Sequence, residues 1–306
     1  MIQLNYAFDA ANEADTFDEL RHEASTARQV VLSDLRGTVL AAYNSYSTTT
    51  PVTALQTVLP VPVQTKKKQQ DESGEEHPDT PKVKALQGNY DLLRYTKRRD
   101  IGLRLLRRSK KCCMCGHRDS GQLDHYLPYS LFPEFTALTV NLIPVCAVCN
   151  LTKSDTYRRA DGGAAYLHAF RDELPNLEQF LVATVDIDDT VVVDFVVEQP
   201  SSMSDAVFET LRSHFELLEL AELYGTQATE LMFEKLVMLH EAAEDGGSAV
   251  AYYLEREAAS IAARRGNNHW EPVALRALAA SNAFCNGGSA ALGPAQGVYH
   301  AAVLGT

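Results

Sequence analysis

The chain has 306 residues, a hydrophobic fraction of 45% and a formal net charge of −12 at pH 7. Its length suits two domains, or one domain with helical extensions, and the charge argues against a protein that coats nucleic acid nonspecifically. Acidic residues throughout the first 30 positions exclude the apolar core of a secretory signal. No apolar run approaches the roughly 20 residues that span a bilayer. We therefore expect a cytoplasmic protein with no membrane partner.

The segment 1–64 is predicted to be helical and then extended. Residues 17–47 carry apolar side chains at helical spacing, and prolines interrupt the sequence that follows. Residues 65–82 are polar and of low complexity, which predicts a linker or an exposed loop. A domain over 83–200 is expected to follow, and its first helix, over 83–109, could be broken at Gly102.

A stretch rich in β-branched residues, 181–198, predicts a hairpin, which we place at the end of the 83–200 domain. From Asp205 onward the apolar spacing is helical. Residues 201–306 are therefore predicted to form an acidic, helical C-terminal domain. Its glutamates would repel DNA, so these helices better suit folding support, a partner surface or restraint of an activity.

Two cysteine pairs have the spacing of zinc knuckles, and 30 residues separate them. Four thiolates in a tetrahedral array suit zinc, and paired cysteines in a reducing compartment favour a metal over a disulfide. We predict a closed, structural Zn²⁺ site, against the alternative of four buried thiols without metal. Cys113 or His117 could replace one of the four ligands. The predicted ligands are Cys112, Cys115, Cys146 and Cys149.

A strongly basic segment precedes the first cysteine pair. Between Arg94 and Arg118 lie ten Lys and Arg residues against Asp100 alone, a local net charge of +9. Basic runs are often solvated helix faces, but this position beside a candidate metal site favours contact with a phosphate backbone. The residues expected to contact nucleic acid are Arg104, Arg107, Arg108, Lys110 and Lys111.

Four further polar residues lie within or beside the cysteine frame. They are Asp124, His125, Asn141 and Asn150. Phosphodiester hydrolysis requires a base that deprotonates water and a cation that neutralises developing charge. Neutral imidazole makes His125 a candidate base, and oxygen ligands from Asp124 and Asn150 suit Mg²⁺ or Mn²⁺. Singly, each of these residues could instead be a surface, turn or capping residue.

Residues 110–157, with the pattern CCMC, LDH, VNLIP and CAVCN in that order, resemble the HNH (ββα-metal) endonucleases. The resemblance is to the bacterial subtype whose small fold is braced by a four-cysteine zinc site. It implies an α+β protein in which a zinc-braced ββα-metal core is embedded in mostly helical N- and C-terminal extensions. It also implies that the metal stabilises the leaving 3′ oxygen, so that cleavage gives 5′-phosphate ends.

The resemblance implies a role for each residue of the motif. Asp124 and Asn150 would bind the catalytic metal, and His125 would be the general base. Asn141 would orient the loop and the base. Lys153 matches a basic residue of the family and is expected to contact phosphate.

The function expected from these features is metal-dependent cleavage of DNA by a regulated effector of a bacterial anti-phage or restriction-type system. A regulatory ATPase or sensor protein, or a homo-oligomer, would control it. Two alternatives stay open: a non-catalytic zinc-knuckle protein that binds nucleic acid or acts as an adaptor, and an RNA-directed nuclease. The sequence contains no evident aromatic platform for single strands, although Tyr95 and Tyr126 could stack on bases. His168 could line the cleft.

Overall fold

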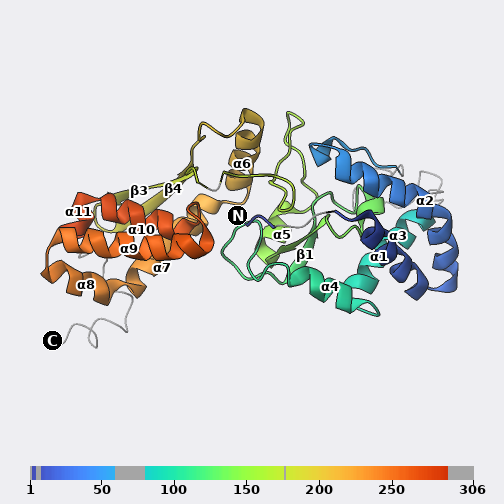
Figure 1. The fold of residues 1–306 in the computed structure, drawn as a ribbon, viewed down its shortest axis with the longest axis horizontal. Helices are drawn as coiled ribbons and strands as arrows, with labels where there is room; N and C mark the ends of the chain where they lie inside the picture. Colours follow the sequence, from blue (N-terminus) through green and yellow to red (C-terminus); the bar gives the residue numbers. More distant parts are fainter. Residues whose placement is uncertain (1, 5–7, 59–79, 176, 289–306) are drawn as a thin grey trace. The chain divides into compact units, whose positions relative to one another are not determined.

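The computed structural model describes residues 2–4, 8–58, 80–175 and 177–288. The chain divides into two compact units, Met1–Glu173 and Leu174–Thr306 (Figure 1). Each unit combines helices with a small two-stranded antiparallel sheet, which confirms the α+β fold class. Most of the linker predicted over 65–82 lies outside the described residues. Among the described helices, none is long and apolar enough to cross a membrane.

Unit 1 begins with two helices, where the sequence predicted one helix over 17–47. Helix α1 (Ala10–Glu23) and helix α2 (Thr26–Thr48) are separated at Ala24 and Ser25, whose backbone is extended. This break reverses the chain, so the two helices pack against each other and against the third helix of the unit. The periodicity of the apolar residues continues across the break, which is why the sequence alone did not reveal it.

The next two helices are α3 (Thr80–Arg94) and α4 (Arg99–Leu106). The break in the helix predicted over 83–109 therefore falls before α4, and Gly102 lies inside α4. Gly102 is buried where α4 meets the end of α3, and a Cβ atom there would lie 2.4 Å from the carbonyl oxygen of Leu93. The glycine permits close helix packing and does not end the helix.

The centre of unit 1 has the chain order strand, strand, helix. Strand β1 (Gln122–His125) pairs antiparallel with β2 (Leu142–Val145), so that His125 lies opposite Leu142. Helix α5 (Ala147–Lys153) follows β2 directly. The loop between the two strands contains a short 3-10 turn, η2 (Pro133–Phe135). This order is that of the ββα core implied by the resemblance.

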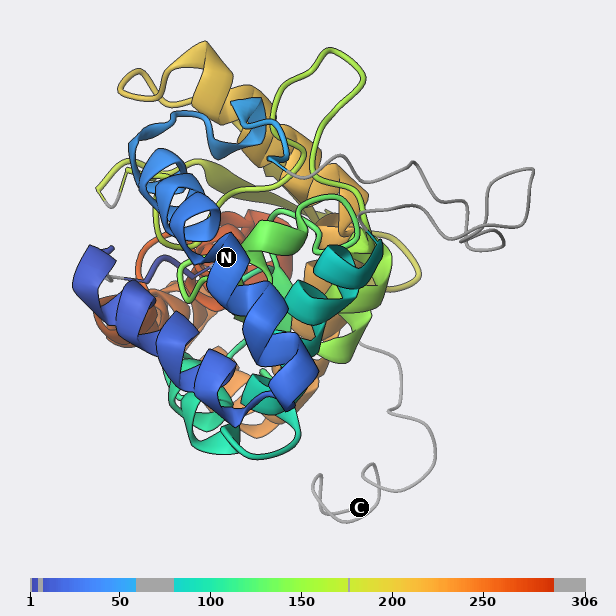
Figure 2. The ribbon, with the colours of Figure 1, turned by 90° about the vertical axis from the view of Figure 1, so that its right-hand side faces the viewer.

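The N-terminal helices hold the long loop between β1 and β2. The buried carboxylate of Glu13 on α1 accepts hydrogen bonds from the backbone nitrogen and hydroxyl of Thr139, at 2.9 and 2.5 Å. In the middle of the loop, the buried Glu134 accepts one from the backbone nitrogen of Val58, at 2.9 Å. Burial raises the pKa of both carboxyl groups. Figure 2 shows α1 and α2, in blue, in front of the green elements of unit 1. The described residues of segment 1–58 are thus part of unit 1.

Unit 2 contains the hairpin that the sequence placed in the 83–200 domain. Strands β3 (Leu181–Ile187) and β4 (Val191–Val197) pair as predicted. However, β4 packs on α7 and β3 on α10, and these contacts assign the hairpin to the C-terminal unit (Figure 1). The helices of this unit are α6 (Asp205–Leu217), α7 (Leu220–Glu234), α8 (Leu236–Glu244), α9 (Gly247–Arg265), α10 (Trp270–Ala280) and α11 (Asn282–Cys285).

The packing at Gly102 makes a testable prediction. Gly102→Ala places a methyl group against the Leu93 carbonyl and is expected to destabilise the protein by about 1–3 kcal/mol. The matched control is Gly37→Ala on α2, where an added Cβ meets no atom within 4 Å. That change is expected to stabilise by up to about 1 kcal/mol, because alanine favours the helix. Calorimetric melting of both variants checks this, and equal effects would contradict the packing explanation.

Candidate functional site

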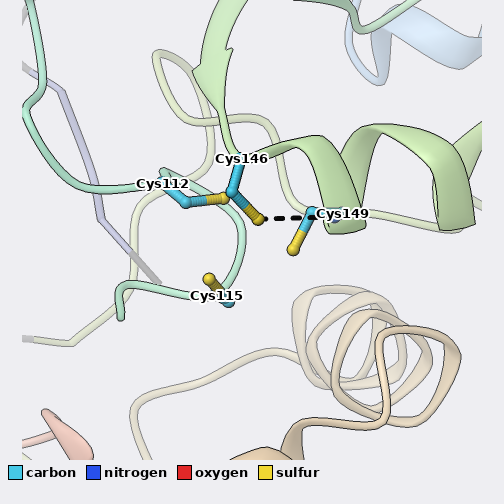
Figure 3. A group of neighbouring side chains, drawn as sticks. All are labelled: Cys112, Cys115, Cys146 and Cys149. Atoms are coloured by element: carbon cyan, nitrogen blue, oxygen red, sulfur yellow. Dashed lines mark hydrogen bonds between the residues drawn. The ribbon is translucent and has the colours of Figure 1, made fainter. Parts of the chain in front are cut away.

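Four buried cysteines form the first part of the site. The sulfur atoms of Cys112, Cys115, Cys146 and Cys149 all lie within 4.8 Å of one another. Figure 3 shows two of them on the loop after α4 and two at the start of α5. The Cys146 sulfur caps the helix and accepts a hydrogen bond from the Cys149 nitrogen, at 3.4 Å. Zinc–sulfur bonds of about 2.3 Å require tetrahedral sulfurs about 3.8 Å apart, so a small inward movement would fit zinc.

The two alternative ligands do not belong to this group. Neither Cys113 nor His117 contributes an atom to the cluster found among the described residues. Cys113 is buried separately, and burial raises the pKa of its thiol to about 12. By contrast, hydrogen bonding with Cys112 lowers the pKa of Cys146 to about 6. The hydrogen bonds among the four sulfurs raise the pKa of Cys112 and Cys149, so it is the geometry that indicates a metal site: these four buried residues could bind a structural Zn²⁺.

Residues between and just after the two cysteine pairs line a cavity of about 330 Å³, which brings three of the four predicted catalytic residues together. Asp124 and His125 reach it from β1, and Asn150 reaches it from α5. Asn141 does not line it. The other lining residues are Tyr90, Arg94, Tyr95, Gln122, Leu123, Pro128, Tyr129, Leu151, Ser154 and Asp155.

His125 is buried, and its orientation is fixed. Its Nε2 atom lies 2.9 Å from the carbonyl oxygen of Thr136. A carbonyl can only accept, so Nε2 carries the proton and Nδ1 has the free electron pair of the neutral ring. Burial, with a smaller contribution from the nearby Lys153, lowers the pKa of His125 to about 4, although the hydrogen bond with Thr136 acts in the opposite direction. The imidazole is consequently neutral at physiological pH, as a general base requires.

Asn141 holds the loop that carries this carbonyl. Its side-chain oxygen accepts hydrogen bonds from the Leu127 nitrogen, at 2.8 Å, and from the Tyr46 hydroxyl, at 3.0 Å. Its side-chain nitrogen donates to the carbonyl oxygens of Leu127, at 3.1 Å, and Phe135, at 3.2 Å. Asn141 is fully buried. An amide that uses both lone pairs and both protons in this way fixes the loop and, through it, the histidine.

Asp124 forms an ion pair with Lys153, the residue that was predicted from the sequence to contact phosphate. Lys153 is 0% exposed, and its Nζ lies 3.1 Å from Asp124 Oδ2 and 2.7 Å from the His125 carbonyl oxygen. This position does not support the predicted contact of Lys153 with phosphate, because the last turn of α5 directs its ammonium inward against β1. The ion pair is within Coulomb range, but Oδ2 has no hydrogen bond of good geometry. Burial raises the pKa of Asp124 despite the lysine.

Asn150 and Asp155 provide further oxygen atoms at the cavity. The Asn150 side-chain nitrogen donates to Gln122 Oε1, at 2.6 Å, which leaves the amide oxygen as the atom suited to a metal. Asp155 was not singled out from the sequence. An acidic residue just after the Asn150–Lys153 turn could have indicated it, because a hard cation prefers several oxygen ligands.

The basic segment divides into exposed and inward-facing residues. Arg108 is turned inward and donates to the Thr139 carbonyl oxygen, at 2.9 Å, with its guanidinium 5.4 Å from the Phe170 ring centre. Its predicted role in nucleic-acid binding is therefore not supported by its position. The exposed members are Arg104, Arg107, Lys110 and Lys111, and the last is paired with Asp119. None of the five lines the cavity, whereas Arg94 does.

Tyr126 and His168 lie away from the cavity. Both are buried, and their rings pack 4.3 Å apart between centres. Tyr126 donates to the Tyr166 carbonyl oxygen, and burial lowers the pKa of His168 to about 3. These two residues support the fold of unit 1.

The fold and the site together describe an α+β protein with a buried four-cysteine cluster. The chain is similar to protein ea31 of Escherichia phage lambda, with 26% identity over 197 residues, and the two are distant homologues. The match covers 60% of this chain and 66% of that protein, just under two thirds of its length. The name ea31 states no activity. No family model matches the chain, and no solved structure matches it.

The cysteine cluster predicts the metal content of the protein. Elemental mass spectrometry is expected to find close to one zinc ion per chain. Cys146→Ser should lose it together with the cooperative melting of unit 1, because zinc contributes as much free energy as a whole domain has. Cys113→Ser is the matched control and should keep its zinc. Loss of zinc from both variants alike would assign Cys113 to the site.

The buried ion pair predicts a large loss of stability when it is broken on one side. Lys153→Met leaves a buried carboxylate without its cation, at a cost of about 3–5 kcal/mol. The double variant Asp124→Asn with Lys153→Met should recover most of this. Lys235→Met, which breaks the more exposed pair with Glu257, should cost less than about 1 kcal/mol. Equal melting temperatures for Lys153→Met and the wild type would instead mean that Lys153 reaches solvent.

Proposed function

We propose that the chain is a metal-dependent HNH-type endonuclease that hydrolyses phosphodiester bonds in DNA. One observation carries this proposal: a neutral, oriented imidazole lies at one cavity with a carboxylate and an amide. His125, Asp124 and Asn150 are those groups, and they come from two elements that Asn141 and the cysteine cluster hold in position. A base and two hard oxygen ligands at one site suit metal-assisted hydrolysis.

In this proposal each residue has a distinct task. The Nδ1 atom of His125 takes the proton of the attacking water, and the Thr136 carbonyl stabilises the protonated ring that results. Mg²⁺ or Mn²⁺ held by Asp124 and Asn150 would supply positive charge at the leaving oxygen.

The ion pair also bears on how tightly a metal is held. Lys153 already offsets the charge of Asp124, so these two residues present no net charge to a cation. We infer that the phosphate of the substrate supplies much of the negative charge that recruits the metal. Metal and nucleic acid would then bind together more tightly than either alone.

Unit 2 supports the proposal of a regulated enzyme. It has its own hydrophobic core, and none of its described residues lines the cavity, so cleavage alone does not explain it. A regulatory ATPase or sensor protein, or self-association, would act through this unit. The phage origin of ea31 suits a setting of conflict between phage and host, either in bacterial defence or on the side of the phage.

A second candidate function is non-catalytic. The Asp124–Lys153 ion pair favours it, because a lysine can serve permanently where a metal would otherwise neutralise the carboxylate. The chain would then be a zinc-knuckle protein that binds nucleic acid or acts as an adaptor.

Cleavage of supercoiled plasmid tests the proposal. With Mg²⁺ or Mn²⁺ the wild type should nick the plasmid. His125→Ala should lower the rate by roughly 10²- to 10⁴-fold, since it removes the base. The matched control is His240→Ala on the exposed face of α8, which should retain full activity. EDTA should abolish cleavage while the zinc content stays unchanged.

The remaining outcomes separate the alternatives. Cleavage by His125→Ala at the wild-type rate would show that His125 is not the general base. A folded, zinc-loaded protein that binds but never cuts DNA or RNA, with or without candidate partners, would favour the non-catalytic function. Cutting of RNA alone would correct the substrate.

A further inference from the structure

The mouth of the cavity carries exposed aromatic rings. Tyr95 is 64% exposed and Tyr129 is 45% exposed, and both line the cavity that contains His125. Large apolar side chains are exposed at few places in the described part of unit 1. They are Val30, Val58, Tyr95, Tyr129, Val148 and Leu151, and three of these line this one cavity. Such a concentration marks a binding surface, because packing within the unit does not require it.

The rings form a connected and fixed group. The hydroxyl of Tyr90 donates to the Leu123 carbonyl oxygen, at 2.8 Å, which fixes that ring against β1. Tyr90 and Tyr95 form a T-shaped pair, with 6.1 Å between ring centres. Its centre also lies 4.7 Å from that of His125, and Tyr129 lies on the histidine at 5.0 Å. The three tyrosine rings therefore form a continuous aromatic surface from the buried His125 to the solvent.

A cation lies beside the most exposed ring of the cavity, that of Tyr95. The guanidinium of Arg94 lies 5.6 Å from the centre of the Tyr95 ring and donates to the Gly121 carbonyl oxygen. An exposed ring with an adjacent guanidinium is suited to a nucleotide, because the ring stacks on the base and the cation attracts the phosphate.

The shape of the nucleic acid decides which form fits. In a duplex the faces of the bases are covered by their neighbours and are not available to a protein ring. A phosphate at His125 can have its own base on Tyr95 only when that base is unstacked. Single strands present their bases in this way, and every base has a face that can stack.

We propose that the site takes single-stranded nucleic acid, with an unstacked base beside the scissile phosphate on the Tyr95 ring. This proposal rests on the proposed nuclease function and narrows its substrate class. It also revises the expectation of no aromatic platform, since Tyr129 lies 39 residues after Tyr90 and 34 after Tyr95, and these rings meet only in the fold.

Binding measured without cleavage tests the proposal. Oligonucleotides that contain the fluorescent base 2-aminopurine are titrated with the full chain in a buffer without added divalent metal. The probes are one sequence as a DNA single strand, an RNA single strand and a DNA duplex. Both single strands should bind more tightly than the duplex, and their fluorescence should be quenched by stacking.

Variants at Tyr95 assign the effect to the ring. Tyr95→Ala should weaken single-strand binding by roughly 5- to 150-fold and remove the quenching, while duplex binding stays unchanged. Tyr95→Phe keeps the ring and should behave as the wild type. The matched control is Tyr252→Ala, which removes a tyrosine that is 65% exposed and lies under Arg256, in unit 2. This control should change nothing.

The outcomes distinguish this proposal from the nuclease assignment. Equal affinity for duplex and single strand, or unchanged binding by Tyr95→Ala, would overturn the single-strand proposal even if plasmid cleavage depends on His125. Single-strand binding that depends on Tyr95 in a protein that never cleaves would support the base-stacking surface and overturn the nuclease. Preference for the DNA or the RNA strand then identifies the natural substrate.

Discussion

The four-cysteine cluster is the constraint on which the site of unit 1 depends. It joins the loop before β1 to the first turn of α5. Once this turn is fixed, Asn150 and Lys153 on the same short helix face β1. A helix of seven residues is too short to be stable alone, so its position comes from the cluster and from the contacts at its far end.

The second organising feature is the loop between β1 and β2, which hydrogen bonds of buried polar side chains hold in place. Glu13, Glu134 and Asn141 accept or donate hydrogen bonds that leave no polar atom of theirs exposed. A buried polar group has one geometry that satisfies it, so these contacts specify the path of the loop. That path carries the Thr136 carbonyl to His125. Helices α1 and α2 thereby help to orient His125 without lining the cavity.

The local features were predictable from the sequence. Ligand type and knuckle spacing indicated the cysteine cluster, and β-branched residues indicated the hairpin of β3 and β4. Each of these signals is carried by residues that are close to one another in the chain. The assignment of that hairpin to a domain was not predictable, since it depends on packing against α7 and α10 much later in the chain. The helix break before α4 was misplaced for a similar reason, because Gly102 is needed for close packing against the Leu93 carbonyl and does not break the helix.

The sequence by itself determined which chemistry is present: four thiols, a histidine beside an aspartate, and two asparagines in an order that resembles a nuclease motif. Only the tertiary structure decided where each charge and ring lies. It buried Lys153 against Asp124, turned Arg108 inward, and gathered the tyrosines around His125. The physical reason is that spacing along the chain fixes local geometry, whereas burial and pairing depend on segments that are distant in sequence.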